Sequence, residues 1–358
     1  MFQLRKFWYI KEALSAWLIF SLVLQVVSVL LLQLLFLIPQ TAQAAEKVVD
    51  PTATGVSGSN NTTGTQTVFT GDQTGYTFYR DSTGQCVYSK TSDGGSSWSA
   101  STLVDSQTDC LKIVVWYDRW TPGDTGDFIH IATLDNSLDD MFYNRLDTTT
   151  DTLLTGSSPT NVSINSGQTP TISVNANTHS LTKATDGSVF MALSDGSDSY
   201  VVSCSASCNN QTNWNEVGVS PLDLQNDHSL LMPLSGGSVL LINRDISAND
   251  LRSSVWNGTS WSSWSTIDTD APENAIYDGG LAATVDTASG NIYLVYAADH
   301  NDAVADHDIR TAIYDGSGWT NTTSVFTNSP NRGVHQVGIG FDQNTGDAYV
   351  SYSAEPSL

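Results

Sequence analysis

The fold is best indicated by residues 91–98, which read Thr91-Ser92-Asp93-Gly94-Gly95-Ser96-Ser97-Trp98. The carboxylate of Asp93 can accept hydrogen bonds from the backbone of its own turn. Gly95 can adopt a positive φ angle that most residues avoid, and the ring of Trp98 offers a large apolar surface for burial between sheets. The octapeptide therefore predicts a tight turn between two strands that ends on a packed tryptophan.

Short apolar or alternating segments recur on both sides of this stretch, and turns rich in Gly, Asp, Asn, Ser and Thr separate them. This pattern is typical of β-strands, and almost no helical periodicity accompanies it. The clearest strand–turn–strand elements have their turns at Thr185–Ser188, Ser235–Ser238, Thr287–Gly290 and Gln343–Gly346. A later turn in several units ends on a tryptophan, as at Trp98, Trp214, Trp261 and Trp319.

These segments group into units of roughly 45–60 residues, a period that indicates the blades of a propeller. The sequence therefore predicts an all-β protein, a β-propeller with six blades of which the second and sixth are irregular. The sixth blade is incomplete, because only Val334–Phe341 and Ala348–Tyr352 supply strands before the sequence stops. Either the sequence is a truncated form of a longer protein, or a strand near Gln66–Phe69 helps to close the ring.

The composition disfavours some classes of partner. Lys and Arg number 14 against 37 Asp and Glu, which gives a net charge of −23. A surface this acidic repels phosphate backbones and anionic lipid, so no nucleic-acid partner is expected. The simplest interpretation of the charge is solubility.

The first 44 residues are expected to direct export. Basic residues precede an uncharged apolar run over residues 14–38, and Ala42-Gln43-Ala44 has the small-residue pattern of a signal-peptidase site. The segment is predicted to be a helical signal peptide that is cleaved after Ala44. An uncleaved membrane anchor is the alternative, because the run is long enough to span a bilayer.

The remaining chain would then be secreted or extracytoplasmic, with membrane contact only through the N-terminal segment. Residues 45–65 are rich in Thr, Gly, Ser and Asn and predict a flexible linker. Residues 66–358 form the predicted propeller domain. Four cysteines in an exported chain indicate two disulfides, and proximity favours the pairs Cys86–Cys110 and Cys204–Cys208 among three connectivities.

The octapeptide matches the Asp-box, whose pattern is Ser/Thr-x-Asp-x-Gly-x-Ser/Thr-Trp, through Thr91, Asp93, Gly95 and Trp98. The chain thereby resembles the sialidase-like superfamily of β-propellers, which carry this BNR or Asp-box repeat. Two later turns, Trp256–Trp261 and Tyr314–Trp319, are degenerate relatives, and they also resemble blades of six-bladed fucose-binding lectins.

The resemblance implies no catalytic residue. Active sialidases clamp a carboxylate with three arginines and use a tyrosine nucleophile with a glutamate and an aspartate acid/base. The Arg-Ile-Pro signature of the family's first blade is absent here. This departure argues against sialic-acid hydrolysis.

Propeller geometry indicates where a ligand would bind. Loops between second and third strands share one face with the loops that enter first strands, opposite the Asp-box turns. Charged, His and Tyr residues in these loops predict a concave polar site around the central channel. The candidate ligand-binding residues are Arg80, Asp81, Asp135, His179, His228, Arg244, Asp245, Tyr277, Asp278, Asp299, His300, Arg332 and His335.

Arginine suits carboxylates or vicinal hydroxyls, and paired aspartates suit acid/base chemistry on a glycosidic bond. For any single aspartate, however, a turn-capping role at a strand end is the favoured interpretation. No cofactor or metal is predicted. Ca²⁺ is the alternative at residues 299–308, which are acidic but do not match an EF-hand loop. Trp120 is predicted on the Asp-box face, as a structural plug or a partner contact.

The function predicted from these features is an exported propeller that binds a glycan or a surface protein without sialidase turnover. The first alternative is a glycoside hydrolase with a diverged active site on the channel face. The second is a purely structural surface protein. The fold by itself does not choose among them.

Overall fold

The computed structural model of the chain describes residues 47–51, 53, 65–107, 109–135, 140–163, 179–194, 199–217, 228–245, 250–269, 280–299, 307–321, 325 and 334–354, with five more between 17 and 25. Two compact units are present, Met1–Lys47 and Val48–Leu358. The five described residues between 17 and 25 are helical. Among the helices that can be described, none combines the length and the apolar character needed to cross a membrane.

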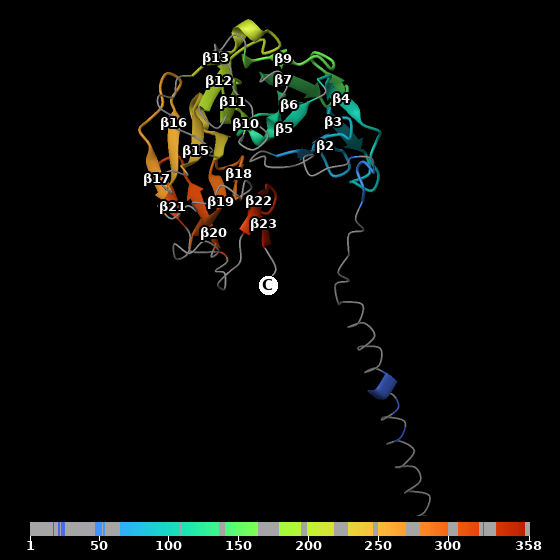
Figure 1. Cartoon of the computed structure of the whole chain (residues 1–358). Helices are drawn as coiled ribbons and strands as arrows, with labels where there is room; N and C mark the ends of the chain where they lie inside the picture. The colour runs from blue at the N-terminus through green and yellow to red at the C-terminus, as the bar shows by residue number, and fades with distance from the viewer. Residues whose placement is uncertain are drawn as a thin grey trace, which may run out of the picture. The chain divides into compact units, whose positions relative to one another are not determined.

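The second unit consists of antiparallel sheets that follow one another in chain order around a central space (Figure 1). In its described part, four sheets have four strands, one has five and the last has two. The elements are β1 (Thr67–Phe69), β2 (Gly75–Arg80), β3 (Cys86–Thr91), β4 (Thr102–Asp105), β5 (Cys110–Tyr117), η1 (Asp118–Trp120), β6 (Phe128–Asp135), β7 (Asp140–Asp147), β8 (Thr152–Leu153), β9 (Thr160–Asn161), β10 (His179–Lys183), β11 (Val189–Ser194), β12 (Ser199–Cys204), η2 (Gln211–Asn213), β13 (Asn215–Glu216), β14 (His228–Pro233), η3 (Ser235–Gly237), β15 (Val239–Asp245), β16 (Asp250–Trp256), β17 (Ser265–Asp268), β18 (Leu281–Val285), β19 (Ile292–Asp299), β20 (His307–Tyr314), β21 (Trp319–Asn321), β22 (Val334–Asp342) and β23 (Asp347–Ala354).

The core forms because the sheets pack face to face through their first strands. The pairs β5–β10, β10–β14, β14–β18 and β18–β22 all contact one another. All eight residues of β5 are buried. Since side chains alternate along a strand, Val114 and Trp116 join one core cluster, whereas Ile113, Val115 and Tyr117 join another.

The turn at residues 91–98 forms as predicted. The carboxylate of Asp93 accepts hydrogen bonds from the backbone N–H of Ser97 (2.8 Å) and from its hydroxyl (2.6 Å), and these bonds lower the pKa of Asp93 to about 2. Gly95 has a φ of 88°. Trp98, however, stays half-buried and belongs to no core cluster, so its predicted burial between sheets is not found.

Other turn tryptophans join neighbouring sheets instead. Trp214 is fully buried in the largest core cluster. The indole N–H of Trp261 donates to the carbonyl of Val217 in the preceding sheet (2.9 Å), and that of Trp319 donates to the hydroxyl of Ser253 (2.9 Å). The degenerate turns therefore provide the inter-sheet contacts that were expected of the octapeptide.

The last and second sheets are irregular, as the sequence indicates. β22 and β23 pair over their length with a register shift near Val334, and the short strands β8 and β9 both pair with β7. β1 pairs with β2, placing Thr67 opposite Thr77, so the strand near Gln66–Phe69 belongs to the first sheet. Its role in closing the ring stays a prediction.

Both predicted disulfides are present. Cys86–Cys110 joins β3 to β5, and Cys204–Cys208 closes a short loop after β12.

Removing the first bridge with Cys86→Ser and Cys110→Ser is expected to lower the free energy of unfolding by about 3 kcal/mol, since it frees a long loop. Its cysteines are 24 residues apart. Removing the second, whose cysteines are 4 apart, should lower it by about 2 kcal/mol. Urea denaturation of both double variants measures the two losses in free energy of unfolding. A larger loss on removing Cys204–Cys208 than on removing Cys86–Cys110 would contradict the prediction.

Candidate functional site

The predicted ligand-binding residues that the structure describes are engaged in internal contacts. Arg80 lies 3.6 Å from the carboxylate of Asp109. Asp81 accepts hydrogen bonds from the backbone N–H groups of Thr83 (2.8 Å) and Gln85 (3.0 Å). Asp81 therefore has the turn-capping role that was the alternative interpretation.

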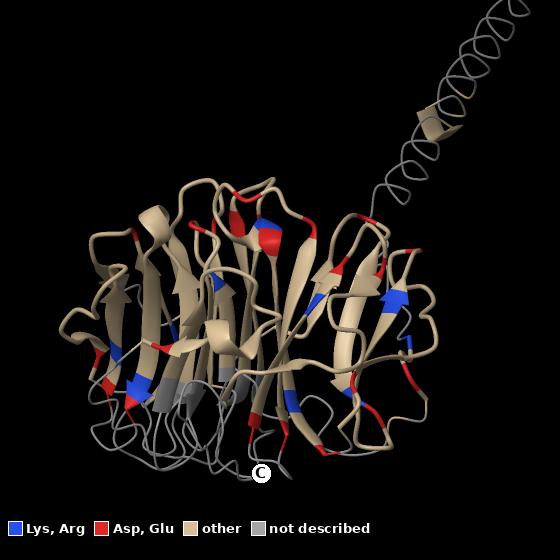
Figure 2. Ribbon diagram, turned by 90° about the horizontal axis from the view of Figure 1, so that it is seen from above, with Lys and Arg blue, Asp and Glu red and all other residues tan. Residues whose placement is uncertain are grey.

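The other three described candidates are buried. Asp135 is inaccessible at the end of β6, and Arg244 is 3% exposed at the end of β15. Asp245 accepts from Arg252 at 2.6 Å. Figure 2 shows most acidic residues at strand ends and in loops. None of these five candidates lines either of the two cavities described below.

The remaining candidates fall outside what can be described. The strands that carry His179, His228, Asp299 and His335 are described, but these four side chains are not. Tyr277, Asp278, His300 and Arg332 lie outside the described residues, as does most of the stretch considered for Ca²⁺. Within the described part, no three His, Cys, Asp or Glu side chains come together as a metal site would require.

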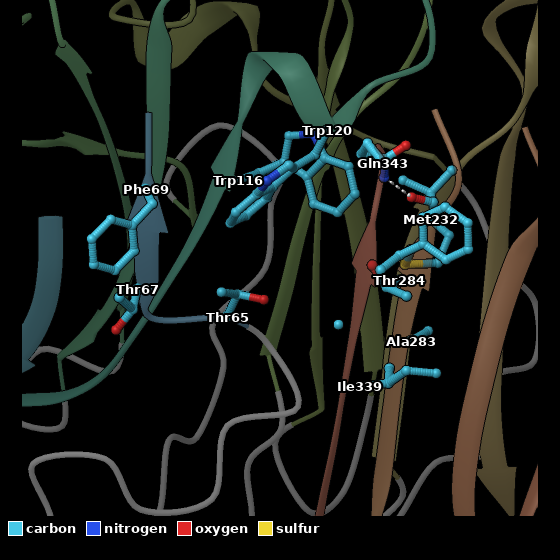
Figure 3. Close-up of a pocket in the computed structure, with 13 residues that line it drawn as sticks. Thr65, Thr67, Phe69, Trp116, Trp120, Met232, Ala283, Thr284, Ile339 and Gln343 are labelled. Atoms are coloured by element: carbon cyan, nitrogen blue, oxygen red, sulfur yellow. Dashed lines mark hydrogen bonds between the residues drawn. The ribbon is translucent and has the colours of Figure 1, made fainter. Parts of the chain in front are cut away.

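A cavity of about 480 Å³ lies at the central space of the sheets, and we call it the axial cavity. Figure 3 shows its aromatic and hydroxyl-bearing side chains around the opening. None of the lining residues that the structure describes carries a charge. They are Thr65, Thr67, Phe69, Trp116, Trp120, Met232, Ala283, Thr284, Val285, Ile339, Gly340, Phe341 and Gln343.

Two tryptophans form one wall of the axial cavity. Trp116 is the last residue but one of the buried strand β5, and Trp120 lies in η1, where the chain turns back. Their rings meet edge to face with centroids 5.7 Å apart. The indole N–H of Trp116 donates to the hydroxyl of Thr121 (2.9 Å), which donates to the carbonyl of Lys183 (2.7 Å). This wall is therefore fixed to the next sheet.

The opposite wall comes from the last two sheets. The Gln343 amide donates to the carbonyl of Val285 (2.9 Å) and accepts from the backbone N–H of Thr287 (2.9 Å). Gln343 thereby holds two hairpin turns together. The Thr284 hydroxyl has no hydrogen bond to another described residue, so it is available to a ligand.

A buried polar network holds η1 in place. Asp118 is inaccessible, and its carboxylate contacts His130 Nε2 (2.9 Å), Lys183 Nζ (2.6 Å) and the backbone N–H of Phe128 (3.0 Å). His130 Nδ1 lies 2.7 Å from the Tyr143 hydroxyl. Burial opposes ionisation of Asp118, but the hydrogen bonds outweigh it and lower its pKa to about 2. Burial lowers the pKa of His130, so the imidazole is neutral at pH 7.

Because Asp118 is ionised and His130 is neutral, Nε2–H donates to the carboxylate and Nδ1 accepts from Tyr143. Gly126 is required beside this network, since a Cβ at that position would meet the Asp118 carboxylate. The sequence around Trp120 predicted a structural plug or a partner contact and no ligand. The signal that could have found this site is the pair of tryptophans four residues apart at the end of an apolar strand.

Solved structures resemble this chain in fold, at low sequence identity. No family model matches the chain, and no curated protein matches it in sequence. AofleA from Arthrobotrys oligospora has a TM-score of 0.50 and 8% identity, over 80% of this chain and 77% of that one. Hydrazine synthase from Kuenenia stuttgartiensis has a TM-score of 0.51 and 10% identity, over 85% and 76%. SapL1 lectin in complex with alpha methyl fucoside has a TM-score of 0.47 and 13% identity, over 74% and 81%.

Identities this low establish the fold alone. Folds of this kind host unrelated functions, so function has to be argued from the site. The chain is an all-β protein built of radially arranged antiparallel sheets, of the propeller type.

Proposed function

We propose that this chain is an exported, six-bladed propeller of the sialidase-like, Asp-box type that binds a carbohydrate in the axial cavity, without sialidase turnover. The observation that carries the proposal is an uncharged cavity with two tryptophan rings on one side and a threonine hydroxyl on the other. The net charge of the whole chain is −23, yet no described residue that lines this cavity carries a charge.

The chemistry of the lining suits a sugar. A sugar ring has an apolar face of C–H groups that pack on an aromatic ring, and a rim of hydroxyls that need hydrogen-bond partners. Trp120 is half-buried and lines the cavity, so part of its ring is accessible. The hydroxyl of Thr284 can both donate and accept. The cavity volume of about 480 Å³ lies within the range of small-molecule sites.

Export is supported by the leader pattern and by the cysteines. All four described cysteines are in disulfides, and disulfides persist in oxidising compartments. The Asp-box geometry at Asp93 and Gly95 supports the superfamily assignment.

The test is a glycan array with the full-length protein, followed by titration calorimetry with the strongest glycan and a parallel assay with fluorogenic glycosides. We expect saturable binding and no release of fluorophore. Trp120→Ala should weaken binding at least about 10-fold, equivalent to 1.4 kcal/mol, because it removes the accessible aromatic surface. Thr284→Val keeps the shape of the side chain and should weaken binding by removing the hydroxyl.

Trp98→Ala is the matched control, because Trp98 is half-buried but lines neither cavity. It should bind as the wild type does. No glycan binding at all, or equal affinity of the Trp120→Ala and wild-type proteins, would refute the proposal. Hydrolysis that depends on Arg80 or Arg244 would favour a glycoside hydrolase instead.

A further inference from the structure

A second cavity, of about 490 Å³, lies between the second and third sheets, and we call it the Arg145 pocket. Its walls come from β6 and β7 on one side and from the β10–β11 hairpin and the loop after β12 on the other. Phe128, His130, Tyr143, Arg145 and Lys183 line it, together with Ser205–Asn209. Among the described residues, none lines both this pocket and the axial cavity.

Arg145 is the unusual group in this pocket. Its guanidinium lies over the ring of Phe128, 4.0 Å from the centroid. It has no ion pair and no side-chain hydrogen bond among the residues that the structure describes. Arg80, Arg119, Arg252 and Arg310 each pair with an aspartate. In a chain with 37 acidic residues, a half-buried arginine without a carboxylate has its donors directed to solvent or to a ligand.

The other cation that lines the pocket, Lys183, is already engaged by carboxylates. Lys183 contacts Asp118 (2.6 Å) and Asp124 (2.7 Å), so one cation lies between two carboxylates. His130 is neutral, as described above, and donates to Asp118. His130 is the cross-strand neighbour of Arg145 in the β6–β7 pair, but it carries no charge at pH 7. Among the described residues, no ion pair joins the Arg145 guanidinium to Asp118 or Asp124, which both engage Lys183.

The rim of the pocket is polar and held in place. Ser205 and Ser207 lie on the loop that the Cys204–Cys208 disulfide closes, and Asn209 directly follows that loop. The amide of Asn213 donates to the carbonyls of Ala206 (2.9 Å) and Ser207 (3.2 Å), which fixes the loop. The backbone of this loop is therefore held beside the pocket, and the exposed side chains of Ser205, Ser207 and Asn209 bring hydroxyl and amide donors to its rim.

We propose that the Arg145 pocket binds an oxyanion, the carboxylate, sulfate or phosphate group of a small ligand, through the guanidinium fork of Arg145. A planar fork that is stacked on an aromatic ring and free of a carboxylate partner is suited to bidentate recognition of an oxyanion. The rim hydroxyls and the Asn209 amide supply the remaining hydrogen bonds. This site is separate from the proposed sugar site.

The experiment is titration calorimetry of the full-length protein at low ionic strength with three probes, namely acetate, inorganic sulfate and inorganic phosphate. We expect saturable binding of at least one probe, and the three arms distinguish a planar carboxylate from a tetrahedral anion. Arg145→Gln should weaken that binding at least 10-fold. Arg145→Lys keeps the charge but loses the fork, and it should fall between the wild type and Arg145→Gln.

Arg119→Gln is the matched control, because Arg119 already pairs with Asp127 and does not line the pocket. It should bind the probe as the wild type does, and so should Trp120→Ala, which alters only the axial cavity. An unchanged far-UV circular dichroism spectrum shows that Arg145→Gln is folded. The absence of saturable binding of all three probes, or equal affinity of the folded Arg145→Gln variant and the wild type, would overturn the proposal.

Discussion

Replacing Asp118 with alanine is expected to destabilise the protein by about 3–5 kcal/mol, because it breaks a buried ion pair from one side. The side chain of Asp118 is 1% exposed. The substitution leaves Lys183 with Asp124 alone and leaves the N–H groups of His130 and Phe128 without their acceptor. Urea denaturation followed by tryptophan fluorescence measures the change.

Asp127→Ala serves as the control, since it breaks only the exposed pair with Arg119 and should change stability little. Equal stability of the Asp118→Ala and Asp127→Ala variants would show that the network does not hold the second and third sheets together. Because Asp118 belongs to η1, its removal should also release Trp120 and weaken glycan binding.

The same carboxylate predicts a dependence of stability on pH. The pKa of Asp118 is lowered from 3.8 to about 2 in the folded protein. A lowered pKa contributes stability that is fully present above the unfolded value and is lost as pH falls through the folded value. The Asp118 contribution should therefore decline between about pH 4 and pH 2, and Asp118→Asn should lose this part of the acid dependence.

Replacing Trp214 with alanine is expected to cost about 3–5 kcal/mol, the range for removing a fully buried tryptophan. Trp214 is inaccessible to solvent, and its ring lies 5.2 Å from that of Tyr143 in the neighbouring sheet. Its indole N–H donates to the carbonyl of Cys208 (3.0 Å). The substitution would open a void between two sheets and remove that donor.

Trp214→Phe should recover part of the loss, because it restores most of the apolar volume without the hydrogen bond. Trp261→Ala, at a half-buried turn tryptophan, should cost less than Trp214→Ala in the same urea assay. A larger loss of stability in Trp261→Ala than in Trp214→Ala would show that burial of the tryptophan does not determine how much each turn contributes to stability.

The strands and turns could be predicted from local chemistry. The turns at Thr185–Ser188 and Gln343–Gly346 lie between paired strands as expected, because Gly and Asp turn signals flank alternating segments. The disulfides followed from proximity in sequence. The irregularity of the second sheet could also be predicted from the sequence, because its repeat lacks the turn that ends on a tryptophan in most of the other repeats.

The cavities could not be predicted, since they depend on which sheets become neighbours. Asp118 meets Lys183 65 residues further along the chain, and no local pattern pairs them. Trp120 was predicted as a structural plug or a partner contact, and its place across the axial cavity from Thr284 depends on the arrangement of the sheets around the axis. The sequence did not single out Arg145. Its distinctive feature is that no described carboxylate pairs with it, whereas Arg80, Arg119, Arg252 and Arg310 each pair with an aspartate.

The most direct test of the proposed function is a crystal structure of the full-length protein with the strongest glycan from the array. We predict density for a sugar ring in the axial cavity, packed against Trp120 and within hydrogen-bond distance of the Thr284 hydroxyl. A glycan bound instead among the loops that carry Arg80 and Arg244 would contradict the assignment of the axial cavity as the sugar site.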